Sequence, residues 1–196
     1  MWESLVMSDI ELEMIKKEKG ILPMFEPFYL ESIVHTADRA NAAFERFDNA
    51  LISGDLNKGL IVANIQEALT HIGELSRYFW PARDNGISIP RGEKLREAFG
   101  LRDDSLLKDR KLRDALEHFD ERLDIYLKQF PVGQLITTPI VGSIESLVPP
   151  MRVFRMVDPA RSTFVILDEK YEFGALREIN KNVLIRGQKI LKDGKS

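Results

Sequence analysis

Two stretches of the chain carry the clearest periodic signal: IVHTADRANAAFERFDNAL at residues 33–51 and IVANIQEALTHIGELSRYF at residues 61–79. In each stretch, apolar residues recur at intervals of 4, 3, 4, 3 and 4 residues. This spacing places them on one face of an α-helix, so each stretch is predicted to be a long amphipathic helix. The apolar positions are Ile33, Ala37, Ala40, Phe44, Phe47 and Leu51 in the first stretch, and Ile61, Ile65, Ala68, Ile72, Leu75 and Phe79 in the second.

The segment between the two stretches, SGDLNKG at residues 53–59, has the composition of a turn. Gly54 can close the first helix. Asp55 or Asn57 can cap the second by accepting a hydrogen bond from one of its first N–H groups. Because the connection is so short, the two helices are predicted to be antiparallel neighbours.

Two further helices are expected downstream. Pro81 ends the second long helix, because proline disfavours helical geometry in the residue before it. Residues 82–92 are predicted to be a loop and residues 93–99 a short helix. Another helix is predicted to run from residues 103–105 to about residue 130, with its apolar side chains on a single face. These side chains are Leu112, Ala115, Leu116, Phe119, Leu123, Tyr126, Leu127 and Phe130.

The C-terminal third has a different pattern. Residues 137–150 contain three prolines and resemble a linker. Two apolar runs, 152–157 and 162–167, flank the sequence Asp-Pro-Ala-Arg and predict a β-hairpin. A third short strand around 171–173 and a helix over about 175–192 are expected after it. The fold class is therefore mainly α, an up-and-down antiparallel helical bundle in residues 1–131, with residues 132–196 as a C-terminal extension that holds a small β-hairpin and a terminal helix.

Composition narrows the chemistry. The chain has 196 residues, of which 44% are hydrophobic and 30% charged, and it has no cysteine. A disulfide framework, a thiolate zinc site and a cysteine nucleophile are therefore excluded. The formal net charge is −3, so any contact with nucleic acid has to be local. With no signal-peptide pattern and no apolar run of about 20 residues, we expect a cytoplasmic protein without a membrane anchor.

Several standard constellations are missing from the sequence. It contains no glycine-rich phosphate loop, no Gly-x-Ser-x-Gly motif and no His-Glu-x-x-His motif. Glu67, His71 and Glu74 share one flank of the second long helix and raise the possibility of a carboxylate–histidine metal site between helices. A polar shoulder beside the apolar face is the favoured interpretation of these three residues. No metal and no cofactor are predicted.

Arg113, Asp114 and His118 form the most suggestive group. On a helical wheel Arg113 and His118 fall outside the apolar face, about 140° apart across the polar side. Asp114 precedes His118 by four residues and is close enough to orient its imidazole. A guanidinium that grips phosphate and a histidine that moves protons are what metal-free RNA cleavage requires. A solvated, ion-paired helix face is the alternative explanation of the same spacing.

The segment RDALEH at residues 113–118 resembles the R-x4–6-H signature of HEPN domains, which are small helical domains of prokaryotic toxin–antitoxin and defence systems. The string EHFDERLD at residues 117–124 also resembles uncharacterised HEPN-like proteins. The resemblance covers roughly residues 28–130 in architecture. Catalytic HEPN proteins are metal-independent endoribonucleases that dimerise and place two Arg–His pairs in one composite cleft. Other HEPN proteins are non-catalytic nucleotide-binding or scaffold modules.

This resemblance implies roles and partners. Arg113 would bind and stabilise the phosphate, His118 would be the general acid/base, and Asp114 would orient them. The protein would be a homodimer with RNA as substrate and a nucleotidyltransferase-like antitoxin as partner. Glu117 and Glu121 depart from this expectation, because negative charge beside the site opposes binding of a polyanion.

Two basic segments add weaker signals. RYFWP at residues 77–81 has the composition of a base-stacking surface, although core packing at a helix end is the favoured interpretation. The C-terminal segment is locally basic and is expected to be a solvated helix, with contact to RNA or to an acidic partner as the alternative. Its basic residues are Lys181, Arg186, Lys189, Lys192 and Lys195.

Overall fold

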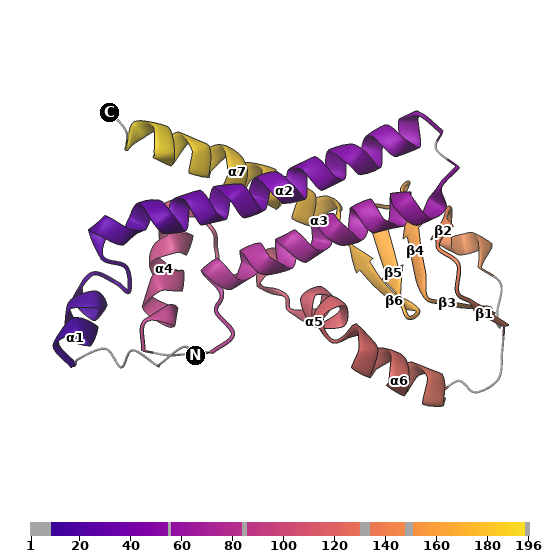
Figure 1. The fold of residues 1–196 in the computed structure, drawn as a ribbon, viewed down its shortest axis with the longest axis horizontal. Helices are drawn as coiled ribbons and strands as arrows, with labels where there is room; N and C mark the ends of the chain where they lie inside the picture. Colours follow the sequence, from indigo (N-terminus) through magenta and orange to yellow (C-terminus); the bar gives the residue numbers. More distant parts are fainter. Residues whose placement is uncertain (1–8, 55, 84–85, 130–133, 148–150, 195–196) are drawn as a thin grey trace, which may run out of the picture.

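The computed structural model of the chain describes residues 9–54, 56–83, 86–129, 134–147 and 151–194. It is mainly helical, with a small sheet in its C-terminal part, as the sequence predicts (Figure 1). The helices are α1 (Asp9–Lys17), η1 (Pro23–Phe25), α2 (Glu26–Ile52), α3 (Lys58–Phe79), α4 (Ser88–Phe99), η2 (Leu106–Lys108), α5 (Lys111–Glu117), α6 (Phe119–Gln129), η3 (Ile144–Ser146) and α7 (Gly174–Asp193).

The α2–α3 pair forms the centre of the molecule and confirms the predicted antiparallel hairpin (Figure 1). All six apolar positions of α3 are buried, and in α2 only Leu51 is partly exposed. Gly54 has φ +67°, the left-handed conformation that closes a helix at low steric cost. The side chain of Asn57 caps α3 by accepting a hydrogen bond from the Leu60 N–H at 3.1 Å. Asp55, the other predicted cap, lies outside the described residues.

The predicted terminal helix is confirmed as α7, which packs along α2 (Figure 1). Asn180 is fully buried, and its Nδ2 donates to the carbonyl of Ala37 at 2.9 Å. Arg177 pairs with Asp48, at 3.0 Å between Nη1 and Oδ1. These contacts and one continuous apolar core join the terminal helix to the segment before residue 131, so the division at 131–132 stays a prediction.

The β-structure follows the helical segment along the chain. β4 and β5 confirm the predicted hairpin, and β6 confirms the third strand; the order in this sheet is β2-β4-β5-β6. β2, within the predicted linker at residues 137–150, pairs parallel with β4, and β1 pairs parallel with β3 on either side of that stretch. The strands are β1 (Gln134–Ile136), β2 (Ile140–Val141), β3 (Met151–Val153), β4 (Arg155–Asp158), β5 (Thr163–Ile166) and β6 (Glu169–Glu172).

Helix α4 is longer than predicted. It begins at Ser88 rather than at residue 93. Pro90 lies in its first turn, where a missing N–H costs no intrahelical hydrogen bond. The proline therefore does not keep residues 88–92 in a loop.

The predicted single helix up to residue 130 is wrong. Instead of starting at residues 103–105, the helical segment begins at Lys111, after the short η2, and it is two helices, α5 and α6, which meet at His118 with φ −110° and ψ 37°. Residues of α5 pack against α3, whereas α6 faces the sheet, where Arg155 lies 4.3 Å from the centre of the Phe119 ring. Because α5 packs on α3 and α6 packs toward the sheet, the chain bends between the two helices (Figure 1). Within the described part of the chain, no helix is long and apolar enough to cross a membrane.

Candidate functional site

Arg113 lies beneath the surface rather than on the polar face that the helical wheel predicts. Its side chain is 8% exposed. A β-carbon added to Gly73 would lie 3.0 Å from Cγ of Arg113, so the arginine stem lies against the α3 backbone. The guanidinium is held loosely, with Nη1 3.5 Å from Ser76 Oγ and Nη2 3.4 Å from Asp114 Oδ1. Its Nε finds no hydrogen-bond partner among the described residues.

Asp114 is turned toward Arg113. Its side chain is 48% exposed, and its carboxylate makes the 3.4 Å contact with the guanidinium. Its link to His118 is through the backbone, because the Asp114 carbonyl accepts a hydrogen bond from the His118 N–H at 3.1 Å. The structure therefore brings Asp114 together with Arg113, and connects it to His118 by one helical turn.

His118 occupies the bend between α5 and α6. Its side chain is 57% exposed, and Nδ1 lies 3.7 Å from Oε2 of Glu121, which is too long for a hydrogen bond. Its backbone lies near the sparsely populated bridge region, where active-site residues are often found. The imidazole is therefore accessible to a ligand.

The negative charge beside these residues is partly neutralised. Glu117 forms an ion pair with Arg77 from α3. Arg110, just before α5, donates to the carbonyl of Pro81 at 3.1 Å. Of these two arginines, Arg77 neutralises an acidic residue of the motif, which reduces the local repulsion of a phosphate.

A cavity of about 460 Å³ lies between α6 and the β5–β6 turn, beyond His118. Sequence reasoning missed it, because one wall comes from α6 and the others come from β3 and the β5–β6 turn, more than twenty residues further along the chain. Only the i, i+4 spacing of His118 and Arg122 indicates that a polar face continues along α6. The lining residues are Arg122, Ile125, Tyr126, Gln129, Arg152, Leu167, Asp168 and Glu169.

Both carboxylates of this cavity accept hydrogen bonds from its walls. Asp168 accepts hydrogen bonds from the Tyr126 hydroxyl at 2.8 Å, from Nη1 of Arg152 at 3.0 Å and from the Val153 N–H at 2.9 Å. Glu169 accepts from the Tyr171 hydroxyl and from Nη1 of Arg122 at 2.9 Å. Each negative charge therefore has a positive partner within the cavity wall.

These hydrogen bonds perturb the titration of the cavity residues. Burial, and then the hydrogen bond to Asp168, raises the pKa of Tyr126. Burial and Glu169 likewise raise the pKa of Tyr171. The hydrogen bond from Tyr171, and then Arg122, lowers the pKa of Glu169. Both tyrosines therefore stay protonated donors, and Glu169 stays ionised at neutral pH.

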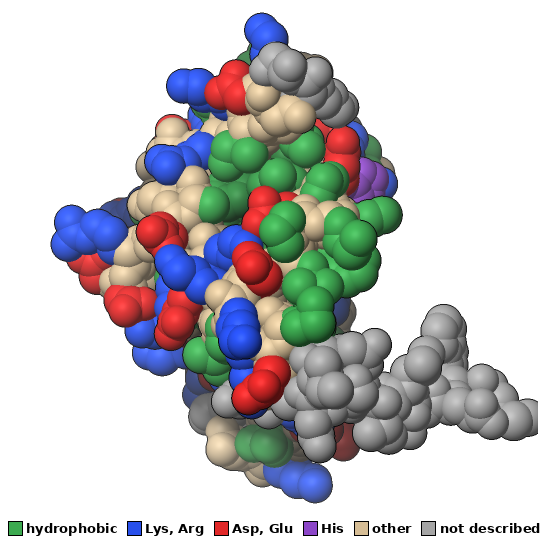
Figure 2. All heavy atoms as spheres, turned by 90° about the vertical axis from the view of Figure 1, so that its left-hand side faces the viewer, with side chains coloured by type: hydrophobic (Ala, Val, Ile, Leu, Met, Phe, Trp, Pro, Cys, Tyr) green, Lys and Arg blue, Asp and Glu red, His purple; other side chains and the backbone are tan. Residues whose placement is uncertain are grey.

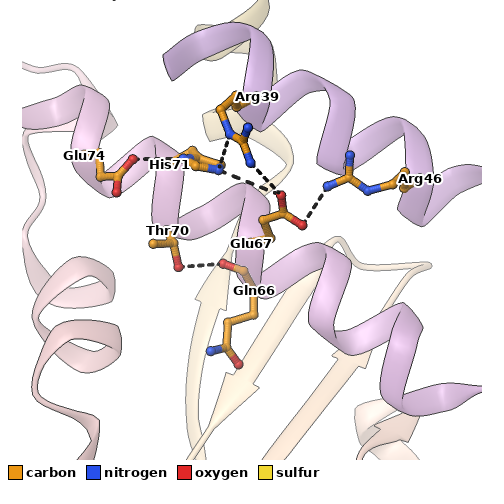
Figure 3. A network of polar contacts seen from close by, with 7 residues as sticks. All are labelled: Arg39, Arg46, Gln66, Glu67, Thr70, His71 and Glu74. Carbon is orange, nitrogen blue, oxygen red and sulfur yellow. Dashed lines mark hydrogen bonds and ion pairs between the residues drawn. The ribbon is translucent and has the colours of Figure 1, made fainter. Parts of the chain in front are cut away.

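Glu67, His71 and Glu74 belong to an ion-pair network between α2 and α3 (Figure 3). Nε of Arg39 donates to Nε2 of His71 at 3.3 Å, so the proton of the neutral imidazole is on Nδ1, 2.9 Å from Glu74 Oε2. Arg46 pairs with Glu67 at 2.6 Å. Among the described residues, no group of three or more His, Asp or Glu side chains is arranged to hold a metal ion. The polar shoulder is thus what the structure shows.

The segment 77–81 is confirmed as core packing at the helix end. Phe79 is fully buried and Trp80 is 7% exposed, so neither ring is available for base stacking. On α7, Lys181 pairs with Glu178 at the surface, whereas Arg186 donates to the carbonyl of Ala98 at 2.6 Å and another face packs on α2, so the terminal helix is solvated on one side only. Lys195 lies outside the described residues.

Comparison of the chain with protein-family models, with curated proteins and with solved structures finds no match.

Proposed function

We propose that the protein is a metal-independent endoribonuclease of the HEPN type. The observation that carries the proposal is an exposed histidine at a helix bend, five residues after an arginine that is held only by long contacts. His118 takes the proton of a ribose 2′-hydroxyl, whose oxygen attacks the adjacent phosphorus while the bond to the 5′-oxygen breaks, and the leaving 5′-oxygen takes a proton from water. Arg113 stabilises the charge that develops on the phosphoryl oxygens.

The loose contacts of Arg113 support this role. Distances of 3.4 and 3.5 Å are long for hydrogen bonds, so the guanidinium gives up little when it exchanges them for a phosphate. A bidentate, charge-assisted contact to phosphate is shorter and stronger than either. Asp114, half-exposed above the guanidinium, keeps it oriented until substrate arrives.

In this proposal the protein is a cytoplasmic homodimer and the toxin or effector of a defence module, with a nucleotidyltransferase-like antitoxin as its partner. These parts come from the HEPN resemblance. A HEPN-like bundle is the fold that would accompany them.

The test is cleavage of a mixed RNA pool in EDTA by the unaltered chain, by His118→Ala and by His35→Ala. His35 is another exposed histidine, on α2, and serves as the matched control. The proposal expects cutting by the unaltered chain and by His35→Ala, no cutting by His118→Ala, and no cutting of DNA, which lacks the attacking 2′-hydroxyl. Equal cutting by His118→Ala would overturn it.

A second candidate, a non-catalytic dimeric or protein-binding module, is favoured by an exposed apolar face. Met24, Phe25 and Phe28, from η1 and the start of α2, are 69%, 46% and 71% exposed. Figure 2 shows hydrophobic side chains gathered on this end of the molecule. Large exposed aromatic residues mark protein interfaces. Two results would favour this candidate. Phe28→Glu would lower the molar mass measured by light scattering, and RNA cleavage would be absent in all variants.

A further inference from the structure

The cavity between α6 and the β5–β6 turn continues the polar face on which His118 lies. The Arg122 N–H donates to the His118 carbonyl at 3.1 Å, so Arg122 follows His118 by one helical turn. Ile125, Tyr126 and Gln129 line the cavity from the next turns of α6. From His118 to Ile125 the axial distance is about 10 Å. When one nucleotide of an RNA strand lies at His118, the nucleotides next to it in the strand lie at the cavity.

The walls of the cavity have the character of a base-binding pocket rather than of a phosphate site. Its volume of about 460 Å³ is within the range of small-molecule pockets. Ile125 and Leu167 provide apolar surfaces, and Gln129 provides an amide that can donate to and accept from a base edge. The charges of Arg122, Arg152, Asp168 and Glu169 cancel, so the interior attracts no polyanion by itself.

Arg122 is placed to contact the strand at the mouth of this cavity. Its contacts with Glu169 and Tyr171 are made by Nη1, and its side chain is 34% exposed. A guanidinium has five N–H donors, so Arg122 can hold a phosphate with Nη2 and Nε while Nη1 stays on Glu169.

We propose that this cavity binds one nucleobase of a single-stranded RNA beside the bond that His118 cuts, with Arg122 on the adjoining phosphate. The inference rests on the proposed RNase function for its substrate class. It assigns sequence preference to Ile125, Gln129 and Leu167, none of which belongs to the HEPN-like motif.

The experiment measures binding of a fluorescein-labelled single-stranded RNA of mixed sequence by anisotropy, in EDTA and at several salt concentrations. All proteins carry His118→Ala, so that no RNA is cut during the measurement. Ile125→Trp fills the cavity from an exposed position, and Leu127→Trp, on another face of the same helix, is the matched control. Arg122→Gln removes the guanidinium that would hold the adjoining phosphate.

Ile125→Trp is expected to weaken binding at least about fivefold with an unchanged salt slope, because a base contact is lost and a phosphate contact is not. Leu127→Trp is expected to bind within about twofold of the parent. Arg122→Gln is expected to make the slope of log K against log salt shallower by about 0.7, the value for one phosphate of a single strand.

Equal affinity of Ile125→Trp and Leu127→Trp, or no RNA binding by the parent, would overturn the inference. Cleavage by the chain with His118 intact is measured separately and decides the proposed function. RNA binding that depends on Ile125 without any cleavage would retain the cavity as a nucleobase site and reject the RNase.

Discussion

A β-carbon on Gly73 would lie 3.0 Å from Cγ and 3.3 Å from Cβ of Arg113, so the arginine occupies the space that a side chain at position 73 would need. Glycine inside a helix costs about 1 kcal/mol relative to alanine. In α3 this cost is linked to the placement of Arg113, which reaches Ser76 on the same helix. The position of the proposed catalytic arginine is thus set by a residue forty positions earlier.

Gly73→Ala is expected to displace Arg113 by a few tenths of an ångström and to lower the rate of RNA cleavage roughly tenfold or more, because catalysis is sensitive to small misplacements. The free energy of unfolding should change by less than about 1 kcal/mol, since the helix gains what the contact loses. Cleavage rates and urea unfolding provide both numbers.

The control is Gly59→Ala, in the first turn of the same helix, which should cleave RNA at the parent rate. If Gly73→Ala also cleaves at the parent rate, the role of Arg113 is contradicted.

Arg113→Met separates catalysis from structure. Methionine keeps most of the buried stem, removes a charge whose Nε lacks a partner among the described residues, and leaves Asp114 half-exposed to water. Replacement of a buried ion pair by apolar residues is often neutral or stabilising, and Asp114 is exposed enough to be solvated once Arg113 is gone. We therefore expect an unchanged or higher melting temperature and at least about a hundredfold loss of cleavage. A loss of stability of more than about 2 kcal/mol with cleavage retained would show that Arg113 is structural.

The parts of the fold that the sequence predicts are those encoded locally. The α2–α3 hairpin follows from apolar spacing within each helix and from Gly54 and Asn57 between them. The β4–β5 hairpin follows from two apolar runs around an Asp-Pro turn. In each case the interacting residues are neighbours along the chain, so a periodic pattern and turn chemistry are sufficient.

The remaining features depend on residues distant in sequence. The bend at His118 arises because α5 and α6 pack on different partners, which a helical wheel of either cannot show. Arg113 is buried because Gly73 and Ser76 leave room for it on α3. β1 and β2 are too short to have a period, and their parallel partners follow later in the chain.

Glu169 is expected to link stability to acidic pH. Its pKa in the folded protein is lowered from the ordinary value of 4.5, chiefly by the hydrogen bond from Tyr171. The stabilisation it provides is therefore present above about pH 4.5 and is lost as the pH falls through the lowered value. Its size is below about 1 kcal/mol, because the Glu169 side chain is 58% exposed.

Tyr171→Phe removes the main cause of this shift. Urea unfolding between about pH 3 and pH 6 should show a shallower acid loss of stability than in the parent. Tyr78→Phe, which alters a tyrosine on α3 outside this network, should keep the parent slope. An identical slope in Tyr171→Phe would mean that the hydrogen bond to Glu169 contributes nothing in solution.

Asn180→Ala tests whether residues 132–196 fold as one unit with residues 1–131. Asn180 on α7 is fully buried and donates to Ala37 on α2, so truncation leaves a cavity and removes a hydrogen bond, at a cost of about 2–3 kcal/mol.

Both tryptophans, Trp2 and Trp80, belong to the segment before residue 131. If the two segments unfold together, the urea midpoint from tryptophan fluorescence should fall as far as the midpoint from circular dichroism. Lys181→Ala, at an exposed ion pair next to it, should shift neither by more than about 0.5 kcal/mol. A fluorescence midpoint that stays at the parent value while the dichroism midpoint falls would make residues 132–196 a separate folding unit, and α7 would then be docked on α2 without contributing to its stability.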